Sequence, residues 1–290
     1  MISTRRFPMR RLAIGLVFVF AAVLGACDWR GPTPTEQLLT ASTGPFAVST
    51  LAVPTSAGFG GGTIYYPSTT PGPFAVVSLS PGFTESQSAI AGWGPRLASH
   101  GFVTIIINTS NPFIDPSQRS TEQRQALTYV VTQGQTSGSP IFGKVDGQRR
   151  GVGGHSMGGG ASLISAQADP TIRAVMPMAP WNSSASFPGI TSPTLILACQ
   201  NDGIAPVGSH ASPMYNSIPA STKKEYISVA GGDHSCANAP TGGGSAVGKF
   251  GVAFLKRFLD NDGRYDPWTC GASKPVAGGS LSEVRSTCPF

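Results

Sequence analysis

Gly154, Ser156 and Gly158 form a G-x-S-x-G motif near the middle of the chain, and this motif restricts the fold more than any other stretch. A short candidate strand, residues 150–152, precedes the motif, and a candidate helix, residues 161–166, follows it. A serine exposed on a sharp strand-to-helix turn needs glycines on both sides, because Cβ atoms would clash there. A chain with 37 glycines can match the motif by chance, so the motif predicts a nucleophile only if the chain supplies partners for it.

The first 27 residues have the composition of a secretion signal. Four arginines among the first eleven residues are followed by an apolar run, residues 12–24, and then by Gly25, Ala26 and Cys27. The apolar run is short for a membrane span. Cys27 has two interpretations: cleavage after Ala26 leaves it as a free cysteine, or a lipobox-like sequence ending at Cys27 leads to its lipidation. Both predict an exported protein.

The charge of the mature chain excludes one class of partner. The formal net charge is +6, but the four arginines of the predicted signal contribute to it and are removed with it. No basic patch strong enough to bind nucleic acid remains, so we do not expect the protein to bind nucleic acid.

The remaining chain is predicted to be one domain behind a short tether. Residues 28–43 are polar and contain prolines, and residues 44–290 show no further change in composition. Apolar, β-branched stretches then alternate with helical ones, which predicts a largely parallel sheet covered by helices on both faces. The expected strands are 46–53, 62–66, 74–79, 102–107, 150–152, 174–178, 194–198 and 225–229, and further helices are expected at 85–100, 121–133 and 247–259.

The connection between the strands 174–178 and 194–198 is too short to hold a lid. About a dozen residues lie between Ala179 and Thr194, where lipases often insert a lid or cap. We therefore expect an open site, with the serine at the surface, that suits a large or chain-like substrate.

A serine nucleophile needs a base, and the order expected after a nucleophile elbow is serine, acid, histidine. His100 precedes Ser156, and His155 is its direct neighbour, so its side chain should point elsewhere. His210 falls in a helix-like stretch and is expected at the surface. His234 lies in a glycine-rich loop after the last expected parallel strand, where functional loops gather. His234 is therefore the predicted base.

The acid is chosen among three aspartates between the serine and the base. Asp169 ends the helix after the elbow and is expected to cap it. Asp233 is adjacent to His234, so its side chain would diverge from the imidazole. Asp202 follows an apolar strand and lies at its carboxyl end, which makes it the predicted acid.

The cysteines support this choice. Once Cys27 is set aside, four cysteines can form two disulfides: Cys199, Cys236, Cys270 and Cys288. Cys199 lies three residues before Asp202 and Cys236 two after His234, so contact between acid and base brings the two thiols close. The other pair would fasten the C-terminal tail. Metal binding is the alternative for these cysteines, but no C-x-x-C pair is present, so we expect no metal and no cofactor.

An oxyanion hole requires two backbone donors. The residue after the nucleophile, Met157, supplies one N–H, and the loop after an early strand usually supplies the other. Here Pro81-Gly82-Phe83 follow the strand 74–79, so the N–H of Phe83 is the second candidate.

Six segments, spread in order from about residue 45 to the C-terminus, resemble bacterial cutinases and the related poly(ethylene terephthalate) hydrolases. They are TIYYP at 63–67, SPGFT at 80–84, GHSMGGG at 154–160, APWN at 179–182, NDGIAPV at 201–207 and HSCAN at 234–238. The resemblance implies a lidless α/β-hydrolase fold, with Ser156, Asp202 and His234 as the triad and Phe83 and Met157 as oxyanion donors.

The same resemblance implies a shallow substrate cleft. Trp181 and Ile204 match positions that flank it, and Phe83 stands where tyrosine is common. Ser235 and the Cys199–Cys236 pair resemble the poly(ethylene terephthalate) hydrolase branch, whereas His155 resembles ordinary cutinases.

The predicted function is hydrolysis of polymeric or small esters by a secreted, monomeric serine esterase that forms an acyl-enzyme. Expected substrates are cutin-like polyesters, with poly(ethylene terephthalate) among them. Two alternatives remain: a lipase or short-chain carboxylesterase, and a non-catalytic surface lipoprotein that has kept the fold.

Overall fold

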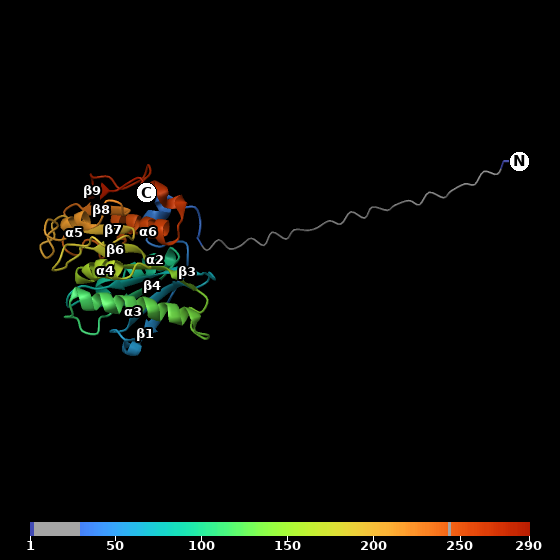
Figure 1. Cartoon of the computed structure of the whole chain (residues 1–290), viewed down its shortest axis with the longest axis horizontal. Coiled ribbons are helices and arrows are strands. Elements are labelled where there is room, and N and C mark those ends of the chain that lie inside the picture. Colours follow the sequence, from blue (N-terminus) through green and yellow to red (C-terminus); the bar gives the residue numbers. More distant parts are fainter. Residues whose placement is uncertain (3–29, 243–244) are drawn as a thin grey trace.

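The computed structural model describes residues 1–2, 30–242 and 245–290, so the predicted cleavage region around Cys27 lies outside the described residues. Within these ranges the chain forms a nine-stranded sheet in the order β1-β2-β4-β3-β5-β6-β7-β8-β9 (Figure 1). The strands are β1 (Val48–Val53), β2 (Gly62–Pro67), β3 (Phe74–Ser80), β4 (Phe102–Ile107), β5 (Val145–His155), β6 (Ile172–Met178), β7 (Thr194–Cys199), β8 (Lys224–Val229) and β9 (Leu281–Ser286).

The centre of this sheet is parallel and its edges are antiparallel. All pairs from β4 through β3, β5, β6, β7 and β8 are parallel, whereas β1–β2, β2–β4 and β8–β9 are antiparallel. Every residue of β3, β4 and β7 is buried, as expected for strands covered on both faces. The mostly parallel sheet predicted from the sequence is confirmed.

Helices cover both faces of the sheet. They are α1 (Glu36–Thr40), α2 (Trp93–Ser99), α3 (Pro116–Gln135), α4 (Met157–Ala168), α5 (Ala211–Ser217), α6 (Ser245–Leu259) and α7 (Asp266–Thr269). The apolar cluster on one face includes residues of α3, α4 and α5, and the cluster on the other includes residues of α1, α2, α6 and α7. Val76 and Val77 of β3 belong to opposite clusters, because successive strand residues point to opposite faces.

Strand order places the functional loops at one edge of the sheet. β3 lies between β4 and β5. After β3 the chain forms β4 on one side of it and then crosses over to form β5 on the other side. Parallel sheets bind ligands beyond the carboxyl ends of their strands, at such a switch point. Phe83 follows β3 and Ser156 follows β5, so both lie at this switch point.

Several elements differ from the sequence prediction, among them α7, which was not expected, and β5, which begins at Val145 and not at residue 150. The helix expected at 85–100 is divided into a 3-10 turn, Gln87–Ile90, and α2, which begins at Trp93. Pro95 lies in the first turn of α2, where its missing N–H costs nothing. β9 was not expected, because this edge strand alternates polar and half-buried residues and has no apolar run. α1 lies within the predicted tether.

The short helix α1 attaches the start of the described segment to the domain. Thr35 caps the helix by accepting the N–H of Leu38, and the side chain of Leu39 is fully buried in the cluster around α6. Glu36 bonds Lys249 of α6 at 2.8 Å and the indole N–H of Trp268 at 3.0 Å. Residues 36–40 are therefore packed on the domain. The division of the chain into a tether, residues 28–43, and a domain, residues 44–290, stays a prediction.

Candidate active site

Ser156 lies between β5 and α4 in a conformation that side chains rarely adopt. Its φ of 54° and ψ of −118° are those of a sharp turn. Its N–H donates to the carbonyl of Met178 at 3.0 Å, and its own carbonyl accepts the N–H of Trp181 at 2.9 Å. A Cβ at Gly158 would overlap the carbonyl oxygen of Ser80, so the turn requires glycine there. Backbone contacts therefore fix the predicted nucleophile in place.

The serine lies at the bottom of the site rather than at the surface, which corrects the sequence expectation. Ser156 is only 6% exposed, and a Cβ on Gly82 would come within 2.9 Å of its Cβ. Among the described residues, the connection from β6 to β7 contains no helix that could act as a lid. The expectation of a lidless site holds, but close packing of the β3 loop on the elbow leaves the serine little exposed.

Asp202 and His234 are hydrogen-bonded, as their predicted roles require. Nδ1 of His234 lies 2.7 Å from Oδ2 of Asp202. The other oxygen, Oδ1, accepts the N–H groups of Ile204 at 2.9 Å and Ala205 at 2.7 Å. Both carboxylate oxygens are thus occupied, which fixes the direction from which Asp202 meets the imidazole.

These hydrogen bonds keep Asp202 ionised although it is buried. Burial of the carboxyl group by itself raises its pKa. The hydrogen bond with His234 and the two backbone N–H donors outweigh burial, so the pKa of Asp202 lies below its ordinary value. A carboxylate in this state can hold Nδ1–H of the imidazole and stabilise a positive charge on the ring.

The contacts within the described residues do not include a hydrogen bond between Ser156 and His234. The two are nevertheless neighbours, because the ring of His155, the residue before the serine, lies 4.7 Å from the ring of His234 between centroids. The bond between a nucleophile and its base is often long in an unliganded site and shortens when substrate binds. The roles of Ser156, Asp202 and His234 as a triad therefore stay a prediction.

Both predicted disulfides are present. Cys199 is joined to Cys236 with a Cα–Cα distance of 5.9 Å, and Cys270 is joined to Cys288. The first bond links the loop after β7 to the loop after β8, and the N–H of Asn201 also donates to the carbonyl of Gly232 at 2.8 Å. The loops that carry the acid and the base are thus tied both covalently and by hydrogen bonding.

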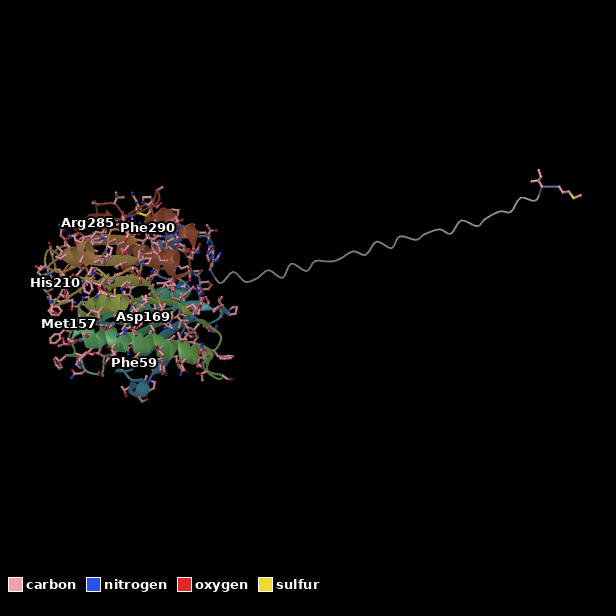
Figure 2. The ribbon with its side chains drawn as sticks, viewed as in Figure 1. Phe59, Met157, Asp169, His210, Arg285 and Phe290 are labelled. Carbon is pink, nitrogen blue, oxygen red and sulfur yellow. A yellow bond between two sulfur atoms is a disulfide. The ribbon has the colours of Figure 1, made fainter. Side chains whose placement is uncertain are left out.

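The two candidate oxyanion donors have free N–H groups. Met157 is the first residue of α4, so its N–H has no partner within the helix. The N–H of Phe83 makes no hydrogen bond to another described residue. Met157 and His210 both lie at the end of the molecule where β5 and β7 end (Figure 2). Phe83 and Met157 remain the predicted donors.

Apolar side chains surround the site at the surface. Phe83 is 47% exposed and Ile204 67% exposed, and Trp181 is half-buried against the ring of His210 at 5.8 Å. The sequence prediction missed two of these contacts. It assigned His210 to the surface without a partner, and it did not consider Phe113, whose ring is 65% exposed and lies edge-on to Phe83 at 5.7 Å.

A buried arginine holds this aromatic pair together. Arg119 of α3 is fully buried and donates to the carbonyls of Pro81, Pro112 and Ile114. These carbonyls belong to the loops that carry Phe83 and Phe113. Their rings are therefore held side by side by the backbone beneath them.

Ser235 is exposed beside the base and lines a cavity. Its N–H and hydroxyl both bond to Asp233, at 3.0 and 2.8 Å. The cavity has a volume of about 390 Å³ and is lined by Glu85, His155, Gly203, Ile204, Asp233, His234 and Ser235. A larger cavity of about 620 Å³ lies along α3 and contains none of the predicted site residues, so we place no chemistry there.

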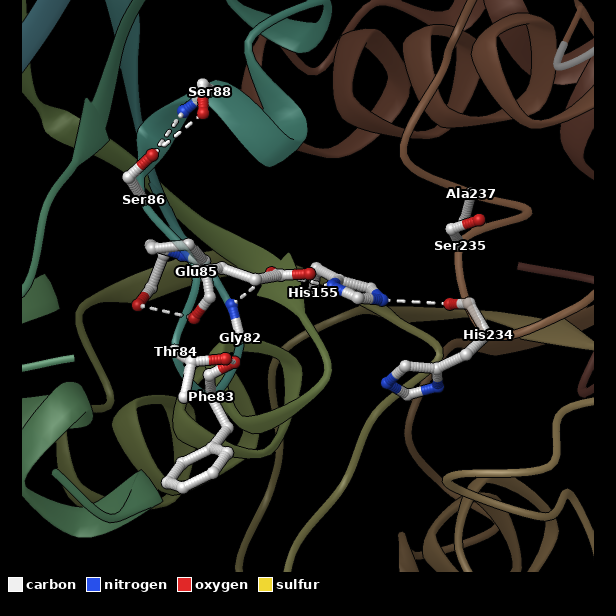
Figure 3. A network of polar contacts seen from close by, with 12 residues as sticks. Gly82, Phe83, Thr84, Glu85, Ser86, Ser88, His155, His234, Ser235 and Ala237 are labelled. Carbon is white, nitrogen blue, oxygen red and sulfur yellow. Dashed lines mark hydrogen bonds and ion pairs between the residues drawn. The ribbon is translucent and has the colours of Figure 1, made fainter. Parts of the chain in front are cut away.

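A second polar chain, which the sequence prediction did not include, lies next to Ser156. His155, set aside as a base, bonds Glu85 through Nδ1 at 2.9 Å and the backbone carbonyl of His234 through Nε2 at 2.8 Å (Figure 3). The same oxygen of Glu85 accepts the N–H of Gly82 at 2.6 Å. Neither Glu85 nor His155 stands in a sequence pattern that indicates the other.

The described residues contain neither a cluster of metal ligands nor a membrane-spanning helix. No three histidine, cysteine, aspartate or glutamate side chains gather closely enough there to hold a metal ion. No described helix has the length and apolarity that crossing a membrane requires.

The fold and the site together define a class of protein: an α/β hydrolase with a serine on a nucleophile elbow and an Asp–His pair at the carboxyl edge of a parallel sheet. Within this class, the chain belongs to the PET hydrolase-like family, which matches residues 26–289. The predicted α/β-hydrolase fold and the predicted family are confirmed, and the protein is a carboxylic ester hydrolase.

Characterised relatives match over most of their length. Cutinase 1 of Thermobifida cellulosilytica is 42% identical over 263 residues, which cover 90% of this chain and 98% of that protein. A cutinase of Thermobifida fusca is 42% identical over 90% of this chain and 85% of its own. A bis(hydroxyethyl) terephthalate hydrolase of Streptomyces coelicolor is 40% identical over 98% of this chain and 92% of its own.

Proposed function

We propose that this protein is a serine esterase that hydrolyses polyesters, including cutin-type and terephthalate esters, through an acyl-enzyme. The observation that carries the proposal is the 2.7 Å bond between Asp202 and His234 at the sheet edge beside the strained elbow of Ser156. The similarity to cutinases and to a bis(hydroxyethyl) terephthalate hydrolase supports the substrate class.

The proposed reaction follows from the roles of three side chains. Ser156 Oγ attacks the ester carbonyl carbon while Nε2 of His234 takes its proton, and the ionised Asp202 stabilises the imidazolium that forms. The N–H groups of Phe83 and Met157 bind the negative oxygen of the tetrahedral intermediate. The alcohol leaves with the proton from His234, and water, activated by the same imidazole, hydrolyses the acyl-enzyme.

A polymeric substrate fits the surface around the serine. The exposed rings of Phe83 and Phe113, together with Trp181, Ile204 and the nearby Ser235, give a chain of ester units apolar contacts beyond the one reacting bond. No lid helix is present in the described β6–β7 connection, so a solid or extended substrate can approach. A lipase specific for long-chain triacylglycerols is the weaker alternative.

A fluorophosphonate probe tests the enzyme assignment. The purified protein should be labelled on Ser156, as located by peptide mapping, and Ser156→Ala should be unlabelled and lose about a millionfold in turnover of p-nitrophenyl butyrate. Retention of the parent melting temperature by the variant would exclude misfolding as the cause. Absence of labelling in the parent protein would favour the non-catalytic lipoprotein. A lipase would prefer long-chain triacylglycerol emulsions to polyester films.

We also propose that the protein acts outside the cytoplasm as a monomer. The two disulfides support an oxidising compartment. Lipidation of Cys27 rests on the sequence alone. The intact mass of the mature protein, purified from cells and from medium, distinguishes a lipidated N-terminus from cleavage after Ala26.

A further inference from the structure

We propose that Glu85 and His155 are positioning residues that hold the oxyanion loop and the base loop in one fixed arrangement around Ser156. The inference rests on the proposed esterase function and concerns residues for which no role in the reaction has been assigned. It is carried by a continuous chain of hydrogen bonds that joins three segments of the polypeptide (Figure 3).

The chain begins in the loop after β3. Oε2 of Glu85 accepts the N–H of Gly82 at 2.6 Å, one residue before the candidate oxyanion donor Phe83. The N–H of Glu85 also donates to the carbonyl of Gly82 at 3.2 Å, which closes the loop on itself. The orientation of this loop therefore depends on the position of the Glu85 carboxylate.

The chain continues through the residue next to the nucleophile. Nδ1 of His155 lies 2.9 Å from the same Oε2, and Nε2 lies 2.8 Å from the backbone carbonyl of His234. The His155 side chain is 2% exposed and that of Glu85 26% exposed, so water competes little for these bonds. The elbow thus connects the loop after β3 to the loop after β8.

Each ring nitrogen of His155 faces an acceptor. A backbone carbonyl and an ionised carboxylate can both only accept hydrogen bonds. Burial raises the pKa of Glu85, but the bonds with His155 and Gly82 outweigh it, so its pKa lies below the ordinary value and the carboxylate stays ionised.

The base loop needs this support at one particular point. Trp93 anchors the loop at Ala237 through its indole N–H at 2.8 Å, and the disulfide anchors it at Cys236. Both of these anchors lie on the C-terminal side of His234, and the bond from the N–H of Asn201 to the carbonyl of Gly232 holds the loop on the N-terminal side. The bond from His155 acts on the backbone of the base residue itself, so it holds that backbone next to the serine.

Two substitutions of Glu85 test the proposal. Glu85→Ala removes the acceptor, and Glu85→Gln removes the negative charge of the side chain that meets His155 and Gly82. Each should lower kcat on p-nitrophenyl butyrate by about tenfold or more with little change in KM, because a misplacement of about 1 Å can cost a hundredfold in rate. Glu85→Gln keeps the size of the side chain, so it remains informative if Glu85→Ala does not fold.

Asp233→Asn is the matched control. Asp233 lines the same cavity and carries the same charge next to His234, but its side chain bonds Ser235 instead of His155. If a negative charge near the base were all that mattered, this variant would lose as much kcat as Glu85→Gln. The proposal predicts that it stays within about twofold of the parent enzyme. Equal losses in the two variants would overturn the proposal.

Side-chain ¹⁵N spectra of histidine-labelled protein give a readout that does not depend on activity. The signals of His155 should shift in Glu85→Gln, because the substitution removes the charged acceptor at Nδ1, and should keep their positions in Asp233→Asn. The signals are assigned by their absence in His155→Asn. Signals of His155 at the same positions in the parent protein and in Glu85→Gln would contradict the proposed chain. Failure of the esterase function would instead appear as an inactive parent enzyme with the same shift of the His155 signals in Glu85→Gln.

Discussion

The two ends of the β7–β8 pair hold buried carboxyl groups in opposite states. At the carboxyl end, Asp202 is 6% exposed and its pKa lies below the ordinary value. At the amino end, Glu225 of β8 is 1% exposed, and burial raises its pKa to about 8. Burial is similar in the two places, so burial alone does not decide which carboxyl group stays charged.

The difference lies in the donors that each end of the sheet provides. Asp202 accepts hydrogen bonds from one imidazole and two backbone N–H groups of its own loop. Oε1 of Glu225 has no partner among the described residues. The neighbouring Lys224 cannot help, because consecutive strand residues point to opposite faces and its ammonium donates to carbonyls of Tyr215 and Ile218. Loops at the carboxyl edge can fold back to supply donors, and a strand interior cannot.

Within this comparison, the largest expected effect comes from neutralising Asp202, the carboxylate that has donors. Asp202→Asn should lower turnover of p-nitrophenyl butyrate by about 10⁴-fold, because an amide cannot stabilise the imidazolium of His234. Steady-state kinetics measure the loss, and the circular dichroism spectrum of the variant should match that of the parent protein. Turnover within tenfold of the parent would contradict the assignment of Asp202 as the acid.

Breaking the disulfide at the carboxyl end should affect stability and rate together. Replacing Cys199 and Cys236 by Ala should cost about 2–5 kcal/mol in unfolding free energy. It should also lower kcat, because the acid and base loops lose their covalent link. Replacing Cys270 and Cys288 is the control, since that bond lies away from the site and spans 18 residues rather than 37. Equal effects of the two double variants on kcat would show that the first disulfide has no role in aligning the site.

The third prediction concerns Glu225, the buried carboxyl group whose Oε1 has no hydrogen-bond donor among the described residues. Glu225 keeps its proton in the folded state up to about pH 8, whereas the unfolded chain releases it near the ordinary pKa of glutamate. The folded state therefore loses stability as pH rises from that value toward 8. Glu225→Gln should remove this loss, and gain up to a few kcal/mol at pH 8 but almost nothing at pH 4.

Urea unfolding at both pH values measures this difference. Asp233→Asn, which changes an exposed carboxylate, is the matched control and should respond to pH as the parent protein does. A pH response of Glu225→Gln identical to that of the parent would mean that Glu225 finds a partner in solution.

Sequence reasoning succeeded for strands and contacts that follow from the order of residues along the chain. The fully buried strands β3, β4 and β7 are apolar without alternation, so their existence could be predicted. Asp202 and His234 follow apolar strands, and the nearby Cys199 and Cys236 indicated that the loops after β7 and β8 lie close together. The order of these residues along the chain carried the prediction.

It failed where a role depends on contacts between distant segments. Glu85 and His155 lie 70 positions apart, and neither stands in a pattern that indicates the other. Phe113 lies next to Phe83 because the buried Arg119 and a hydrogen bond from the N–H of Thr84 to the carbonyl of Pro112 join their loops, and no sequence pattern indicates these contacts. β9 was missed because an edge strand buries one face only in part, which leaves no apolar run in the sequence.

Three consecutive glycines in the first turn of α4 pack against neighbouring backbone. A Cβ on Gly158 would overlap the carbonyl of Ser80, one on Gly160 that of Trp181, and one on Gly159 would lie 2.9 Å from that of Gly154. No side chain can be added at these glycines without displacing the backbone that carries the nucleophile. Variation that adapts the enzyme to new polymers is therefore confined to residues that project away from this turn, such as Phe83, Phe113 and Ile204. The site can evolve at its rim while its floor stays unchanged.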